Sequence, residues 1–117
     1  MILGIGVDIA DNSRFIDIKE GLKKKLFSEY EIEKAKKAPS ESEFLSSRFA
    51  AKEAFSKAMG TGFKAICPKY IEIREDDKGK PFICLLRKID SDFKIHLSIS
   101  HERKMSVAMV VLEDVAH

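Results

Sequence analysis

The chain has 117 residues, of which 44% are hydrophobic and 34% charged, and its formal net charge is +2. This composition predicts one globular α+β domain over residues 1–117, and the small charge gives no indication of nucleic-acid binding. The sequence opens without a basic n-region, and its longest apolar run is too short to span a membrane. Two cysteines make neither a disulfide framework nor a zinc set. These features favour a cytoplasmic protein that does not contact a membrane.

The first half of the chain predicts one strand followed by helices. Ile2–Ile9 has the pattern of a strand, with glycines that allow another backbone to approach closely. Arg14–Leu26 has apolar residues at helical spacing, but Gly21 predicts that this helix is short or broken. A capping box at Ser28–Glu31 predicts a second helix, which Pro39 ends.

A second capping box, Ser40–Glu43, predicts a long helix that runs to about Met59. One broad face of it is apolar, formed by Phe44, Ala51, Phe55, Ala58 and Met59. Glu53 and Lys57 lie on the opposite side, and their i,i+4 spacing is that of an ordinary solvated ion pair. Arg48 lies within the apolar arc, which indicates either a side chain reaching for solvent or contact with a partner or ligand.

The second half predicts antiparallel strands. Residues 70–74 and 82–86 form a hairpin around a polar turn, and residues 93–100 and 105–112 form two further strands. The last strand is apolar on both faces, so it should be central in a sheet or buried between subunits. We expect the few residues after Leu112 to fray. One strand, then helices, then antiparallel strands is the order of an α+β fold.

Three polar residues lie at the boundaries of these apolar elements. Asp8 closes the first strand, Glu53 lies on the long helix, and His101 follows the strand of residues 93–100. Two carboxylates with Lys57 nearby form a candidate Mg²⁺ site at which the lysine could bind a phosphate. Each residue also has an ordinary explanation, Asp8 as a turn residue and His101 as an exposed loop histidine.

Three segments together resemble a known family. These segments are Gly4–Ile9 followed by Arg14, then Phe49–Ala58, then Ser98–His101, and Gly79–Pro81 adds a fourth. They resemble the holo-[acyl-carrier-protein] synthases, the small 4′-phosphopantetheinyl transferases of bacterial fatty acid synthesis. The resemblance runs from the first strand to the last, and the order and separation of the segments make it specific.

The resemblance implies a role for each matching residue. Asp8 and Glu53 would be the Mg²⁺ ligands, and Lys57 would bind the pyrophosphate of coenzyme A. Arg48 and His101 would bind the nucleotide end, including its 3′-phosphate.

The same resemblance extends to the nucleotide base and to protein partners. Lys80 and Pro81 would form the turn beside the adenine. Arg14 would dock the acidic recognition helix of apo-acyl-carrier protein. The family also implies a homotrimer with sites between neighbouring subunits, which would account for Arg48 and for the doubly apolar last strand.

The implied reaction is attack by a serine hydroxyl of the carrier protein on the β-phosphorus of coenzyme A. Adenosine 3′,5′-bisphosphate is the leaving group, and Glu53 or a metal-bound water would accept the proton. Two other functions remain open. One is a nucleic-acid-binding module, although the strands lack an aromatic platform for bases. The other is a Mg²⁺-dependent phosphohydrolase that uses the same carboxylates.

Overall fold

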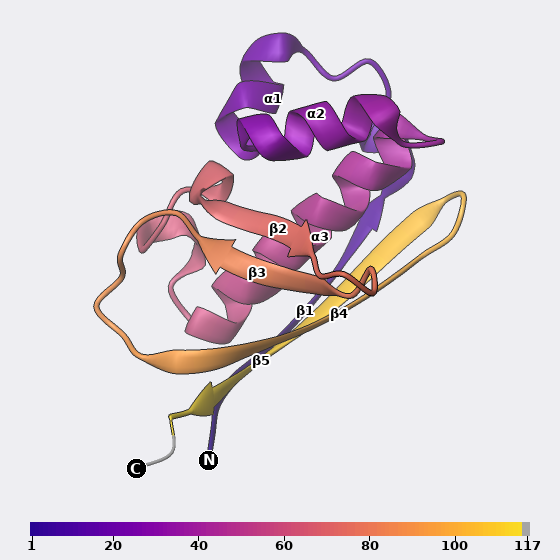
Figure 1. Ribbon diagram of the computed structural model, residues 1–117. Coiled ribbons are helices and arrows are strands. Elements are labelled where there is room, and N and C mark those ends of the chain that lie inside the picture. The colour runs from indigo at the N-terminus through magenta and orange to yellow at the C-terminus, as the bar shows by residue number, and fades with distance from the viewer. Residues whose placement is uncertain (116–117) are drawn as a thin grey trace.

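The computed structural model describes residues 1–115 and has one long helix between two antiparallel sheets (Figure 1). The larger sheet has the strand order β1-β5-β4, formed by β1 (Ile2–Asp11), β5 (Met105–Asp114) and β4 (Phe93–His101). The smaller is the hairpin of β2 (Ile71–Glu75) and β3 (Pro81–Leu85). The expected α+β class is confirmed, and the doubly apolar last strand is central in its sheet.

Three α-helices follow β1 in the chain. They are α1 (Glu20–Leu26), α2 (Glu29–Lys37) and α3 (Glu41–Met59). Figure 1 shows α1 and α2 beside the first turns of α3, with the hairpin on one side of α3 and the larger sheet on the other. Within residues 1–115, no helix has the length and apolar character needed to cross a membrane.

The helix α3 is buried on almost every side from Leu45 to Ala58. A single apolar face was therefore an incomplete prediction, because this helix packs against both sheets rather than covering one. Even Ser46, Ser47 and Ser56 are buried along it. Glu53 is only half-buried and Lys57 is exposed, so these two residues mark the side of the helix that remains accessible.

Both predicted capping boxes lie at helix starts, but they differ. At Ser28 the side chain accepts from the amide of Glu31, whose carboxylate accepts in turn from the amide of Ser28. At Ser40 the side chain accepts from the amide of Glu43. The Glu43 carboxylate contacts His101 instead of completing the box.

Several predicted boundaries were wrong. The first strand continues to Asp11, so Asp8 lies within β1 and does not close it. The predicted helix over residues 14–26 is interrupted between a 3₁₀ turn at Asn12–Phe15 and the start of α1, and Gly21 lies inside α1. The interruption contains Asp17, whose φ of 55° is left-handed and incompatible with a continuous helix. The last strand continues to Asp114 rather than fraying after Leu112, because Glu113 pairs with Ile2 and Lys94. The rest of the predicted frayed end includes residues 116–117, which lie outside the described residues.

The strand β1 lies unusually close to α3 because it carries glycine where it crosses the helix. A Cβ on Gly6 would lie 1.9 Å from the carbonyl oxygen of Ala54, and one on Gly4 would lie 2.1 Å from that of Ala58. Both distances are far below any real contact, so only glycine permits this approach. The close contact sets the position of Asp8, two residues after Gly6, relative to the helix.

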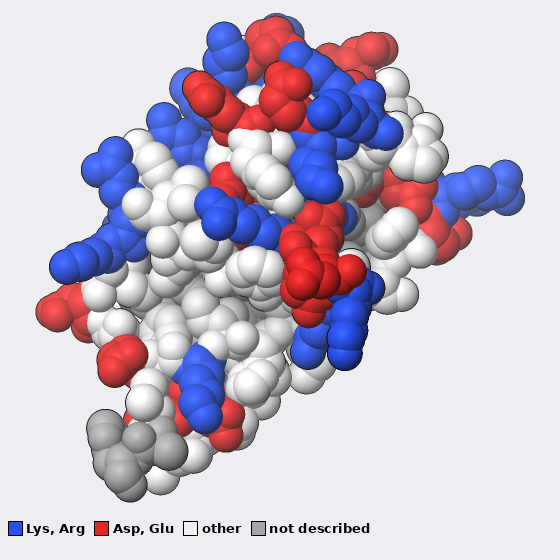
Figure 2. Space-filling model, in the orientation of Figure 1, with Lys and Arg blue, Asp and Glu red and all other residues white. Residues whose placement is uncertain are grey.

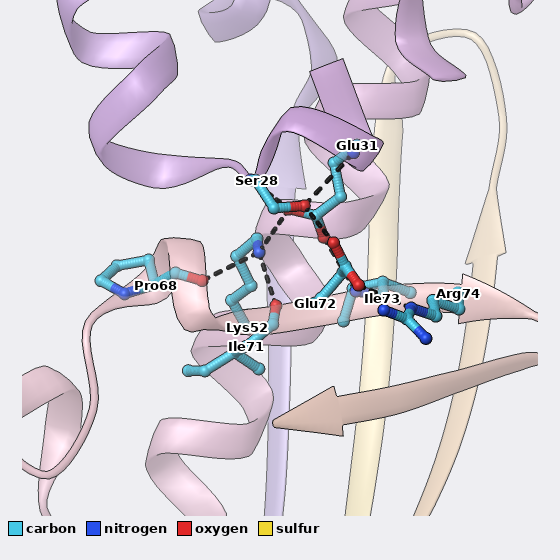
Figure 3. A network of polar contacts seen from close by, with 8 residues as sticks. All are labelled: Ser28, Glu31, Lys52, Pro68, Ile71, Glu72, Ile73 and Arg74. Carbon is cyan, nitrogen blue, oxygen red and sulfur yellow. Dashed lines mark hydrogen bonds and ion pairs between the residues drawn. The ribbon is translucent and has the colours of Figure 1, made fainter. Parts of the chain in front are cut away.

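A buried ion pair attaches the hairpin and α2 to the other side of α3 (Figure 3). The fully buried Lys52 Nζ donates to Glu31 Oε1 at 2.8 Å, and to the carbonyl oxygens of Pro68 at 2.9 Å and Ile71 at 2.6 Å. These three acceptors use all three ammonium donors. The other Glu31 oxygen accepts from the Ile73 amide at 2.8 Å. The network therefore holds α2, α3 and β2 together.

We predict that Gly6→Ala lowers the free energy of unfolding by about 3 kcal/mol, because the methyl group must push β1 away from α3. Chemical denaturation measures this loss. Gly21→Ala is the matched control, because no atom lies within 4 Å of the added Cβ. The control should be stabilised by about 0.5–1 kcal/mol, since alanine is the better helix former. Equal effects of the two changes would contradict the close-contact explanation.

We predict that Lys52→Met lowers the free energy of unfolding by about 3–5 kcal/mol, since it leaves the Glu31 carboxylate buried without its cation. Adding Glu31→Gln should recover part of that loss by removing the unpaired charge. The control Lys36→Met breaks the exposed pair with Glu33 and should change stability by less than about 0.5 kcal/mol. Equilibrium denaturation of the three variants tests this, and a small loss in Lys52→Met would refute it.

Candidate active site

Asp8, Glu53 and Lys57 meet where β1 passes the second half of α3. Asp8 has the same orientation as Gly6 and Ala10, which pack on the helix, while the residues between them face away. Lys57 Nζ donates to Asp8 Oδ1 at 3.0 Å and to the carbonyl oxygen of Val7 at 3.2 Å. The strand and the helix thus bring Asp8 together with two side chains, one helical turn apart on α3, that lie far from it in sequence.

The two carboxylates interact unfavourably in this arrangement. Partial burial raises the pKa of Glu53, and the neighbouring charge of Asp8 raises it further. Lys57 and Arg14 act in the opposite direction, but they do not cancel the shift. A cation between Asp8 and Glu53 would relieve both the desolvation and the repulsion.

This donor set fits magnesium. Mg²⁺ is commonly held by one or two carboxylates and completes its octahedral shell with water and substrate phosphates. Among residues 1–115 no three histidine, cysteine, aspartate or glutamate side chains converge as a complete metal cage. Asp8 and Glu53 are therefore suited to an ion shared with a phosphate, and not to a closed structural metal site.

Arg14 lies next to this group, in the 3₁₀ turn that follows β1. Its guanidinium lies over the rings of Phe15, at 5.8 Å, and Phe49, at 5.6 Å, measured to the ring centroids. Its charge also reaches Glu53, whose pKa it lowers. Because Arg14 is exposed, it is available to a partner at the edge of the candidate site.

Arg48 does not join the group around Asp8. Its Nη2 donates to Glu75 Oε1 at 2.6 Å, its Nη1 donates to the Ser47 hydroxyl at 3.0 Å, and its carbon Cζ lies 3.8 Å from the centroid of the Phe44 ring. Burial lowers the pKa of Arg48, and the carboxylate of Glu75 partly offsets that shift. The position of Arg48 within the apolar arc is therefore explained by an ion pair within this chain, with the Glu75 carboxylate at the end of β2.

Lys80, Pro81 and His101 lie beside the carboxylates of Glu75 and Glu43. Pro81 pairs with Glu75 across the hairpin, and Lys80 precedes it in the turn. His101 ends β4, where its Nδ1 contacts the Glu43 carboxylate on the first turn of α3. Glu43 precedes Glu53 by ten residues of helix, which is about 15 Å along the axis.

The predicted site residues therefore form two groups on one chain. The acidic group, Asp8 with Glu53 and Lys57, lies at the β1 edge of the larger sheet. The second group, formed by Arg48, Lys80, Pro81 and His101, lies toward the β4 edge and the hairpin turn. In a single chain, the central strand β5 lies between the two edges.

Comparison with known proteins identifies the family. The family model described as the 4′-phosphopantetheinyl transferase superfamily matches residues 4–111, which include every residue of both groups. The chain belongs to this superfamily. The transferase match confirms the family resemblance of the sequence over nearly its whole length.

Individual relatives also match over nearly the whole length of both chains. The holo-[acyl-carrier-protein] synthase of Halothermothrix orenii is 45% identical over 97% of this chain and 99% of its own. That of Clostridium acetobutylicum is 41% identical, with 97% and 98% covered. The crystal structure of the Bacillus anthracis holo-(acyl-carrier-protein) synthase in complex with CoA (3′,5′-ADP) matches at a TM-score of 0.87 and 41% identity, covering 98% and 99%.

Sequence reasoning did not find the acidic partners of the transferase's basic residues. Glu75 contacts Arg48, and Glu43 contacts His101. The sequence pattern assigned Glu43 a local role in a capping box and gave Glu75 no role. No spacing rule links residues 27 or 58 positions apart, so only an unexplained buried arginine signalled that a partner had to exist.

Proposed function

We propose that this protein is a holo-[acyl-carrier-protein] synthase that uses Mg²⁺ to transfer 4′-phosphopantetheine from coenzyme A to a serine of apo-acyl-carrier protein. The observation that carries the proposal is the meeting of Asp8, Glu53 and Lys57 in a chain of this family. A cytoplasmic location is part of the proposal, because Cys67 and Cys84 are both free thiols.

In this proposal Asp8 and Glu53 hold the magnesium ion and Lys57 binds the pyrophosphate. When bound, Mg²⁺ would neutralise charge on the phosphates and on the leaving group. Lys57 neutralises Asp8 in the free protein, and its exposed side chain can turn to a phosphate when a cation takes over that role. Glu53 or a water bound to the ion would accept the proton of the serine hydroxyl.

The second group, which would bind the nucleotide, belongs in this proposal to the neighbouring subunit's half of a shared site. Asp8 and His101 lie on strands at opposite edges of one sheet, so placing the β1 edge of one chain beside the β4 edge of the next would bring the two groups together. Such head-to-tail contacts close into a ring, and we propose a homotrimer. Within it, Arg48 and His101 bind the nucleotide phosphates, and Lys80 and Pro81 lie beside the adenine.

An apolar sheet face supports this assembly. Ile5, Val7 and Ile9 of β1 are 59%, 54% and 61% exposed, and Met109 of β5, opposite Val7, is 46% exposed. Apolar side chains rarely remain in water over such a continuous surface unless another protein covers it. Arg14, at the end of β1, would then remain outside this interface and dock the acidic helix of the carrier protein.

Mass spectrometry of apo-acyl-carrier protein incubated with this protein, coenzyme A and Mg²⁺ tests the function directly. We expect the mass of the carrier protein to increase by one phosphopantetheine group on serine. A phosphohydrolase would release nucleotide products and leave the carrier protein unmodified, and a nucleic-acid-binding module would change neither reactant. Either of those results would overturn the proposal.

We predict that Asp8→Asn and Glu53→Gln each reduce the rate of this transfer by at least about a hundredfold, because each removes a charge from the metal site. The free energy of unfolding should change by less than about 1 kcal/mol, since neither side chain packs in the core. The control Glu33→Gln removes an exposed acid from α2 and should retain full activity. Near-wild-type rates in either site variant would refute the metal assignment.

We predict that light scattering of the wild-type protein gives the mass of three chains. Met109→Glu places a charge on the apolar sheet face and should yield folded monomers that no longer transfer phosphopantetheine. Leu86→Glu is the matched control, because Leu86 is similarly exposed, at 42%, but follows β3 outside that sheet. Active monomers of Met109→Glu would contradict the shared site.

A further inference from the structure

The ion pair between Arg48 and Glu75 leaves the arginine only partly satisfied. Its guanidinium donates single hydrogen bonds to Glu75 and Ser47, whereas an arginine has five N–H donors. Its Nε is buried and has no partner within the described part of the chain. A buried donor without an acceptor is costly, so the contacts with Glu75 and Ser47 leave Arg48 short of its full hydrogen-bonding capacity.

Glu75 is held in place independently of Arg48. Its second oxygen accepts from the Tyr30 hydroxyl at 3.2 Å, while its first oxygen receives Arg48. It ends β2, directly before the turn that contains Lys80. Figure 2, in the orientation of Figure 1, shows acidic and basic side chains next to one another at the right-hand end of the hairpin, where this turn lies. An anion that approached Arg48 from the turn would therefore meet a fixed carboxylate.

We propose that Glu75 is a specificity-determining residue that limits the affinity of Arg48 for the 3′-phosphate of the nucleotide. The proposal rests on the proposed function, in which Arg48 binds that phosphate. Glu75 orients the guanidinium, but its negative charge opposes the phosphate dianion that the same guanidinium attracts. The consequence is moderate retention of adenosine 3′,5′-bisphosphate, which must leave before the next coenzyme A binds.

Glu75 both orients the Arg48 guanidinium and repels the phosphate. A variant that removes the charge of Glu75 but keeps its shape separates these two effects. Glu75→Gln keeps an oxygen that can accept from Arg48, so the guanidinium stays oriented while the repulsion disappears. A charge at a few ångströms in a partly wet site changes phosphate affinity by about three- to tenfold. The gain should be confined to ligands with a 3′-phosphate.

The experiment is calorimetric titration of wild-type protein and Glu75→Gln with coenzyme A and with 3′-dephospho-coenzyme A. We expect Glu75→Gln to bind coenzyme A about three- to tenfold more tightly, with less than about a twofold change for the dephospho form. Inhibition by adenosine 3′,5′-bisphosphate should strengthen by the same factor. Thermal unfolding establishes that the variant is folded.

Asp77→Asn is the matched control, because it removes the same charge from an exposed position in the same turn. It should change the affinity for coenzyme A by less than about twofold. An equal gain in Asp77→Asn, an equal gain for the dephospho form, or no gain in Glu75→Gln would each overturn the proposal.

Arg48→Lys distinguishes failure of this proposal from failure of the proposed function. It keeps a positive charge without the planar fork, and it should reduce the preference for coenzyme A over its dephospho form. Unchanged preference would overturn both the phosphate role of Arg48 and the role of Glu75. The mass-gain assay would still decide, separately, whether the protein is a transferase.

Discussion

The backbone contact between β1 and α3 is the constraint on which the rest of the molecule depends. Gly4 and Gly6 let the strand lie against the carbonyl oxygens of Ala58 and Ala54. At that separation, Asp8 from the strand lies near Glu53 on the helix, and burial together with the charge of Asp8 raises the pKa of Glu53. A reaction that needs two carboxylates on one cation would therefore depend on Gly4 and Gly6, which have no side chain to keep the strand away from the helix.

The opposite side of α3 is organised by charge burial instead. Lys52 and Glu31 are both fully buried, and their hydrogen bonds extend to α2, to β2 and to the segment before β2. Removing charges from water is expensive, so such a pair stabilises a fold only when every donor and acceptor is satisfied. Here it fixes the hairpin, and therefore the Lys80–Pro81 turn, relative to the helix that carries Glu53.

Much of this arrangement could be predicted from local rules. The cap at Ser28, the end of α3 at Gly60 and the alternation of the strands all depend on neighbours within a few residues. The break after Phe15 was misplaced at Gly21, because the left-handed Asp17 has no signal as strong as a glycine. Arg48 was flagged as anomalous, but its partner Glu75 comes from another element and no local rule could identify it.

The sequence by itself determined the elements, the acidic residues and, through the match over residues 4–111, the family. These depend on residue type, period and order, which a chain carries before it folds. Tertiary structure alone decided that Asp8 meets Lys57, that Arg48 meets Glu75, and that the two groups lie at opposite edges of one sheet. Such contacts join residues on different elements, which have no fixed spacing in the sequence. They therefore depend on how the helix and the strands pack.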